Sequence, residues 1–352
     1  MPQVVKIAII LLLLAVPVEG AKIRKELPNP PPPDLLLEGG RKLSYERSFG
    51  SEREVKGKPS FWAKMANLIA GEADTRSLVR PYGIAVDSRG RAIITDPGAH
   101  GIHIFDFTRN KYKFIERQEK GKQSMLMPQG VAVDADDNIY VTDSEEGKIF
   151  VFSAEGKYRR VLASSKDGEG YFKRPTGIAV DSTAERIYVT DTLRHRIYVL
   201  DFAGKVMKTI GNRGNGKGEF NYPTDLLLQG QELAVVDAMN FRVQFVDLGG
   251  VGRTSIGSSG DSSGSIFRPK GISIDSEGHY YIVDGLWGVV QVFDHQGRLL
   301  YYFGKRGTAA GDFLLPTGLC IDRQDRVFVV DTFNRRVQVF HYFAARAGGN
   351  VQ

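Results

Sequence analysis

Residue types that support catalysis are present in this sequence, but they form no recognisable catalytic pattern. Histidine can act as an acid, a base or a metal ligand, and the chain has six: His100, His103, His195, His279, His295 and His341. The sequence contains no Ser-His-Asp order, no Cys-x-x-Cys pair and no glycine-rich phosphate loop that follows a strand. Motifs alone therefore identify no catalytic residue.

Aspartate is the polar residue with regular spacing. One series reads Asp87, Asp134, Asp181, Asp275 and Asp322, and a second reads Asp96, Asp143, Asp191, Asp237, Asp284 and Asp331. A catalytic or metal site needs a few special residues, whereas these recur throughout the chain. We therefore expect their carboxylates to accept backbone N–H groups at turns. A calcium ion held by some of them is the alternative, and no other cofactor is expected.

These aspartates belong to a motif that occurs six times. Its copies begin at Pro81, Pro128, Pro175, Pro223, Pro269 and Pro316, with separations of 47, 47, 48, 46 and 47 residues. Each copy holds four short segments rich in β-branched and aromatic residues and bounded by turn residues, which is typical of strands. Four-stranded sheets of this length bury their faces by stacking around an axis. The prediction is an all-β, six-bladed β-propeller with four-stranded blades.

The motif resembles the NHL repeat, whose name describes an Asn-His-Leu run between the second and third strands. The corresponding segments here are residues 192–196, 238–242 and 332–336. The resemblance covers residues 81–342, implies the propeller fold and is closest to exported, bacterial-type members. It leaves function open, because the family includes RNA binders, protein binders, kinase sensor domains and enzymes.

Residues meet at the axis of a propeller only when they occupy equivalent positions in different blades. The six histidines occupy different repeat positions, so they cannot converge. An amidating lyase of similar fold places metal-binding histidines beside the channel, but the residues after each repeat proline here are Tyr82, Gln129, Thr176, Thr224, Lys270 and Thr317. We therefore expect no metal site of that kind.

The sixth repeat lacks a fourth strand of its own. The chain beyond its third strand continues only into a tail, residues 344–352, whereas residues 41–50 resemble residues 297–304, a fourth strand. We expect residues 41–50 to complete the sixth blade, which joins the two ends of the domain and removes an exposed sheet edge.

The chain begins as an exported protein does. Lys6 precedes an apolar run from Ile7 to Val16 and then small residues, which predicts a signal peptide over residues 1–20. The run is shorter than the roughly 20 residues that span a bilayer, and an uncleaved anchor is the alternative. The protein is therefore expected in the periplasm or outside the cell.

Two further segments precede the repeats. Residues 21–40 are rich in proline and predict a stiff spacer. Within residues 41–80, Phe61, Met65 and Ile69 lie four apart after the closing strand, which predicts a short amphipathic helix. This helix would lie on the propeller, with a membrane surface as the alternative.

Cysteine usage and charge add little to the functional prediction. Cys320 is the only cysteine, so no intramolecular disulfide can form, and its place within a strand indicates a small buried hydrophobe. The net charge of +6 is spread over loops and balanced locally by acids. It indicates a solvated surface rather than a basic patch.

These observations predict a non-catalytic binding or scaffold protein that recognises a protein or an envelope polymer through one propeller face. Nucleic acid is not expected as a partner of an exported protein, and membrane contact would come only from an uncleaved signal or the short helix. The predicted binding residues lie between second and third strands: Arg194, Arg196, Phe241, Arg242, Trp287, Phe333, Arg335 and Arg336. Bracing of neighbouring blades is the alternative for Arg196, Arg242 and Arg336. A hydrolase or lyase with a channel metal is the competing function.

Overall fold

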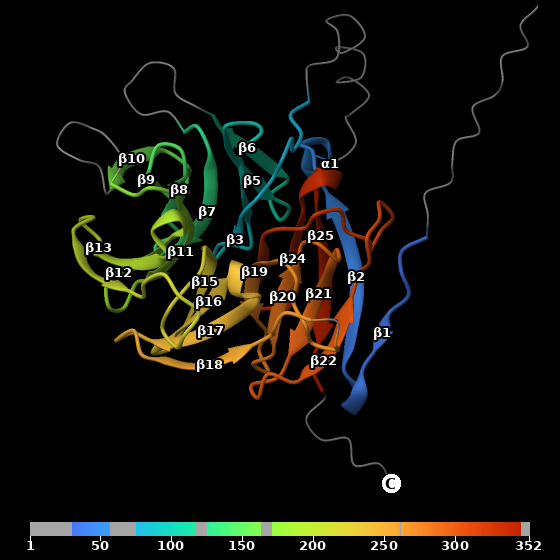
Figure 1. Ribbon diagram of the computed structural model, residues 1–352. Coiled ribbons are helices and arrows are strands. Elements are labelled where there is room, and N and C mark those ends of the chain that lie inside the picture. Colours follow the sequence, from blue (N-terminus) through green and yellow to red (C-terminus); the bar gives the residue numbers. More distant parts are fainter. Residues whose placement is uncertain (1–29, 57–74, 117–124, 163–170, 261, 346–352) are drawn as a thin grey trace, which may run out of the picture. The chain divides into compact units, whose positions relative to one another are not determined.

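The computed structural model describes residues 30–56, 75–116, 125–162, 171–260 and 262–345 (Figure 1). The expected signal peptide, the expected helix at residues 61–69 and the end of the tail lie outside these ranges, as do residues 21–29 of the proline-rich spacer. Within the ranges, no helix is both long enough and apolar enough to cross a membrane. Among the described residues, nearly all of the regular secondary structure is strand.

Six antiparallel sheets follow one another along the chain. The first blade consists of β3 (Ile84–Val86), β4 (Ala92–Asp96), β5 (Gly101–Asp106) and β6 (Lys111–Ile115). The second consists of β7 (Pro128–Val133), β8 (Ile139–Asp143), β9 (Lys148–Phe152) and β10 (Tyr158–Leu162). The third consists of β11 (Pro175–Asp181), β12 (Arg186–Asp191), β13 (Arg196–Asp201) and β14 (Val206–Ile210). The fourth blade consists of β15 (Pro223–Gln229), β16 (Glu232–Asp237), β17 (Arg242–Asp247) and β18 (Gly252–Ile256). The fifth consists of β19 (Pro269–Ile274), β20 (Tyr280–Asp284), β21 (Val289–Phe293) and β22 (Leu299–Phe303).

The sixth sheet joins the two ends of the domain. Its order is β1 (Leu35–Leu36), β2 (Lys42–Phe49), β25 (Arg336–Phe343), β24 (Arg326–Asp331) and β23 (Leu319–Ile321). β2 pairs with β25 along its whole length, from Lys42 opposite Phe343 to Phe49 opposite Val337. The expected closing strand is therefore confirmed, and β1 adds a short fifth strand outside it (Figure 1).

The sheets form a closed ring of blades. The first strand of each blade contacts the first strand of the next, and β23 of the sixth blade contacts β3 of the first. These six strands therefore surround a central channel, and the predicted six-bladed β-propeller is confirmed. The core consists of six clusters of buried apolar side chains, most of which combine residues of two adjacent blades.

One repeated core position lies three residues before each of the last four prolines. Phe172, Phe220 and Phe313 are buried there and pack between blades. Phe267, which stands two residues before Pro269, is only half-buried and packs edge-on against Trp287 with ring centroids 5.7 Å apart. Ile266 takes the core position instead, because it is the residue that stands three before Pro269.

Two smaller elements complete the description. Cys320 lies in β23 as expected, but it is only partly buried; burial nevertheless raises the pKa of its thiol to about 12. α1 (Arg53–Lys56) is a single turn directly after β2, and its Val55 is buried against the first and sixth blades.

Candidate functional site

The two faces of the ring differ in which connections they carry. Each first strand begins, and each second strand ends, on the same face, since the strands are antiparallel. We call this the proline face; it consists of the loops that lead into the repeat prolines and the turns between second and third strands. The opposite face consists of the turns between first and second strands and between third and fourth strands.

The second-strand aspartates hold the loops of the proline face in place. Asp191 accepts the backbone N–H groups of Lys173 and Arg174 at 2.8 and 3.0 Å. The other five bind the backbone ahead of their own repeat prolines in the same way: Asp96, Asp143, Asp237, Asp284 and Asp331. All six are fully buried. The expected structural role is confirmed.

The first-strand aspartates close turns on the opposite face. Asp87 accepts the backbone N–H groups of Arg89 and Arg91 at 3.0 and 2.9 Å. Asp134, Asp181, Asp275 and Asp322 do the same in their own blades. Across the described ranges, no group of three or more His, Cys, Asp or Glu side chains is placed to hold a metal ion. Calcium binding stays a prediction for metal analysis.

Two of the predicted binding arginines brace the fold. Arg242 donates to the buried carboxylate of Asp237 at 2.9 Å and to the carbonyl oxygens of Gly216 and Glu219. Arg336 makes the same set of bonds to Asp331, Ala309 and Asp312. Both therefore tie a turn to the loop that leads into their own blade, which was the alternative open for them.

The arginines of the third blade differ. Arg194 donates to the carbonyl oxygen of Tyr171 at 2.8 Å and lies over the rings of Tyr171 and Tyr198. Arg196 makes one bond, to the carbonyl oxygen of Arg194 at 3.2 Å. Arg196 therefore lacks the carboxylate contact that braces Arg242, although it stands at the same repeat position.

The remaining predicted binding residues are three aromatic residues and Arg335, and they differ in exposure. Phe241 ends the short helix η3 (Ala238–Asn240) in a left-handed conformation, φ 57°, and is half-buried. Arg335 ends η4 (Thr332–Asn334) in the same conformation and is exposed. Phe333 and Trp287 are 59% and 56% exposed. These two rings are thus exposed on the proline face, as is the ring of Tyr171.

The histidines occupy separate local sites. His195 ends η2 (Thr192–Arg194), and its Nδ1 accepts the backbone N–H of Tyr222 at 3.1 Å. His103 is buried in β5, with Nδ1 2.8 Å from the hydroxyl of Tyr112. His279 contacts Asp275 in a turn of the opposite face. These three side chains lie in the third, first and fifth blades, respectively.

Four cations lie at the mouth of the channel on the proline face, outside the predicted set of binding residues. Arg80, Arg174, Arg268 and Lys270 line a depression of about 350 Å³ together with Phe333. No acidic residue of the described part of the chain lines it. Within the described ranges, none of the four side chains has an ion pair or a hydrogen bond, whereas Arg242 and Arg336 are paired. The position before each repeat proline was the signal that would have found the arginines.

The positive charge at the mouth on the proline face has no counterpart at the other end of the channel. The depression there, also about 350 Å³, is lined by Asp87, Asp134, Asp137, Asp322 and a single arginine. Burial, together with Arg268 and Arg174, lowers the pKa of Lys270 to about 8.

Below the mouth the channel narrows to a cavity of about 40 Å³. Four glycines line it: Gly83, Gly130, Gly177 and Gly318. A side chain would not fit there, since a Cβ at Gly130, for example, would lie 2.1 Å from the carbonyl oxygen of Thr176 in the next blade. The fourth blade has Asp225 at this position, and burial raises the pKa of its carboxyl to about 7. Burial also raises the pKa of Tyr82, which lines both spaces, to about 12.

Sequence comparison agrees with this architecture. Residues 125–152 and 313–340 match the NHL repeat, and residues 180–252 match a six-bladed β-propeller family. The chain is a six-bladed β-propeller with NHL repeats. No curated protein matches the propeller in sequence.

Solved structures share the fold of this propeller. A Bacteroides thetaiotaomicron protein of unknown function has a TM-score of 0.66 at 15% identity, over 86% of this chain and 76% of its own. An auxiliary nutrient binding protein from the same organism has 0.58 at 12%, over 75% and 69%. A Staphylococcus aureus virginiamycin B lyase, crystallised in inactive form with quinupristin, has 0.53 at 18%, over 76% and 85%. At these identities the likeness shows the fold alone.

Proposed function

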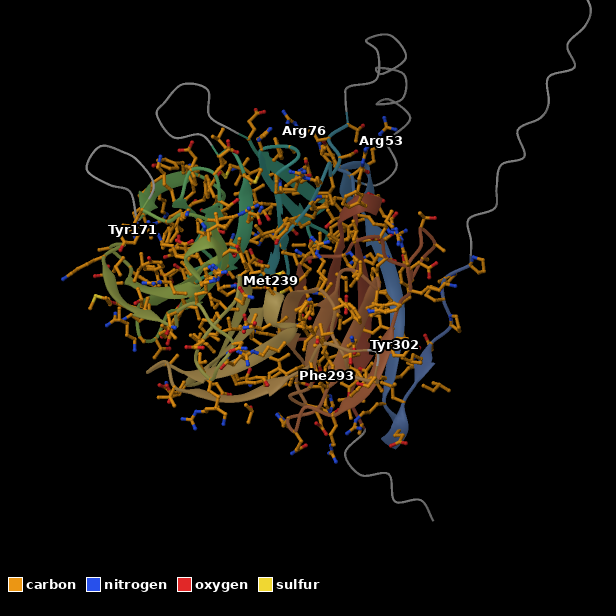
Figure 2. All side chains as sticks on the ribbon, in the orientation of Figure 1. Arg53, Arg76, Tyr171, Met239, Phe293 and Tyr302 are labelled. Carbon is orange, nitrogen blue, oxygen red and sulfur yellow. The ribbon has the colours of Figure 1, made fainter. Side chains whose placement is uncertain are left out.

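We propose that this propeller is a non-catalytic binding protein that works outside the cytoplasm and captures a protein or envelope polymer on its proline face. The observation that carries the proposal is the distribution of exposed apolar side chains over the loops. Among the loop residues that the structure describes, six lie on the proline face: Val79, Tyr171, Met239, Leu286, Trp287 and Phe333. One, Val251, lies on a turn of the opposite face. Figure 2 labels Tyr171 and Met239.

Exposed apolar side chains among arginines are characteristic of recognition surfaces, because a partner can desolvate them at little cost. The loops that carry these side chains are held rigidly by the buried aspartates, so the surface is formed before the partner arrives. A rigid surface of this kind loses little conformational entropy on binding.

The test is capture of a partner from an envelope fraction by immobilised protein. Trp287→Ala should weaken capture by about 1–3 kcal/mol, as for a hot-spot aromatic residue. Its melting temperature should hardly change, because the indole is 56% exposed. Val251→Ser on the opposite face is the matched control and should leave capture unchanged. Loss with Val251→Ser but not with Trp287→Ala would place the partner on the other face.

The competing function is that of a hydrolase or lyase with a channel metal. Metal analysis of the same purified protein, combined with assays on ester and lactone substrates, separates the two functions. A stoichiometric metal together with turnover would overturn the binding proposal.

A further inference from the structure

We propose that the mouth of the channel binds a phosphate monoester, whose three terminal oxygens are received by Arg80, Arg174 and Arg268. This inference rests on the proposed binding function, since it names the chemical group that the proline face recognises.

The first argument is the placement of the arginines around the channel axis. Each directly precedes a repeat proline, Pro81, Pro175 or Pro269, and these open the first, third and fifth blades. Equivalent positions in alternate blades of a six-bladed ring are related by a rotation of about a third of a turn. The three guanidinium groups therefore approach one depression from three directions.

The second argument is uncompensated charge. Other arginines of the fold have carboxylate partners, such as Arg91 with Asp87 and Arg326 with Asp322. The mouth arginines and Lys270 have no such partner in the parts of the chain that the structure describes. Like charges held together repel one another, so an anion that neutralises them is bound favourably.

The third argument concerns the shape of the ligand group. A monoester phosphate carries about −1.5 to −2 charges at neutral pH and three equivalent acceptor oxygens. A carboxylate has two oxygens, and a phosphodiester has two terminal oxygens and one charge. Of these three groups, the monoester alone offers one oxygen to each of three arginines, and arginine is the residue best matched to phosphate geometry.

The surroundings of the arginines limit how deep the group can enter. The channel below holds only about 40 Å³, and Asp225 lines it, so an anion meets both a steric and an electrostatic barrier there. Phe333 borders the depression on the outside and is 59% exposed. The phosphate therefore stays at the mouth, with its ester substituent directed past Phe333 toward solvent.

The experiment is calorimetric titration of the full chain at pH 7.5 and low salt with phenyl phosphate, inorganic phosphate, diphenyl phosphate and benzoate. Phenyl phosphate should bind with one-to-one stoichiometry, and at least about tenfold more tightly than diphenyl phosphate or benzoate. Inorganic phosphate should bind more weakly than phenyl phosphate, because it has no group to contact Phe333.

Arg174→Gln should weaken phenyl phosphate binding by about tenfold, the usual effect of removing one charged hydrogen bond, and should retain the wild-type melting temperature. Arg186→Gln is the matched control; Arg186 lies on the opposite face and donates only to its neighbour Glu185. It should bind as the wild type does. An equal loss with both variants would overturn the proposal, since it would indicate a non-specific charge effect.

Two other results would also overturn it. Equal affinity for phenyl phosphate and diphenyl phosphate would contradict the three-oxygen arrangement, and absence of heat with every probe would exclude an anion site. Neither result depends on the envelope partner. If Trp287→Ala weakens partner capture but phenyl phosphate does not bind, only this inference is overturned. If phenyl phosphate binds but no partner is captured, the proposed binding function of the wider proline face is overturned instead.

Discussion

The backbone N–H of Arg174 donates to the carboxylate of Asp191 at 3.0 Å. The same bond joins Arg80 to Asp96 at 2.9 Å and Arg268 to Asp284 at 3.3 Å. The second-strand aspartate, which recurs in every blade, thus fixes the main chain of the residue before the repeat proline. That residue is arginine only in the first, third and fifth blades. The fold and the candidate site share this bond, so mutating the aspartate should affect both.

Asp191→Ala should lower the free energy of unfolding by about 2–4 kcal/mol, because two backbone N–H groups would lose their acceptor in a buried place. Urea denaturation measures this change. Phenyl phosphate affinity should fall as well, since Arg174 would no longer be held in position. Asp181→Ala removes two acceptor bonds in an exposed turn, to Thr183 and Ala184, and should cost about 1 kcal/mol without changing affinity. Equal losses of stability would contradict this account.

The closing strand should be essential to the ring. Phe49 in β2 is 1% exposed and packs against Phe105 of the first blade, with ring centroids 4.9 Å apart. Phe49→Ala should cost about 3–5 kcal/mol, the usual range for a buried aromatic side chain. Deletion of residues 41–50 should cause aggregation, because it exposes the edge of β25. The exposed Glu46→Ala is the control, and a deletion that melts like the parent would refute the role of β2.

His195 should influence stability rather than any activity. Burial, and then Arg213, lower the pKa of its imidazole, and Nδ1 can accept the N–H of Tyr222 only when it is unprotonated. The unfolded chain, with a histidine pKa of about 6.5, therefore binds the proton more readily. The stability from neutral His195 is complete above about pH 6.5 and falls as the pH drops below it.

Thermal melting from pH 8 to pH 5 tests this expectation. His195→Ala should flatten the part of the pH dependence that lies below about pH 6.5, while partner capture persists. Loss of capture or of any activity by folded His195→Ala would instead indicate a direct role in function.

Asp225 should lower stability at high pH. Its folded pKa of about 7 lies above the unfolded value of about 3.9, so the folded state binds more protons between them. Stability contributed by the protonated carboxyl is present at low pH and is lost as the pH rises toward about 7.

Asp225→Asn removes this ionisation. The free energy of unfolding of the variant, measured by urea denaturation and taken relative to that of the wild type, should therefore be higher at pH 8 than at pH 5. It should also bind phenyl phosphate more tightly than the wild type at pH 8, because a negative charge below the mouth is gone. An unchanged ratio of the two affinities between pH 6 and pH 8 would show that Asp225 does not reach the ligand.

Much of the fold was predictable because each blade is specified locally. Prolines 46 to 48 residues apart, the β-rich segments and the turn residues predicted six four-stranded blades, and the likeness of residues 41–50 to a fourth strand predicted the closure. The aspartates were correctly assigned to capping, because a group that serves every turn must recur in every repeat.

Residues that differ between repeats were harder to place. Arg242 and Arg336 looked like binding residues until their contacts with Asp237 and Asp331 were visible. Arg196 stands at the same repeat position and has no such contact. Spacing cannot distinguish these cases, because the bracing depends on the loop that packs above each arginine.

The sequence by itself determined the repeat, the blade and the closure of the ring, since these depend on hydrophobic period and turn chemistry within about 47 residues. Only the tertiary structure decided that Arg80, Arg174 and Arg268, each 94 residues from the next, share one depression with Lys270. Closure brings alternate blades to a common axis, and this concentrates charges that are isolated along the chain. The same closure buries Asp225, so its carboxyl is shifted by an environment that no local segment contains.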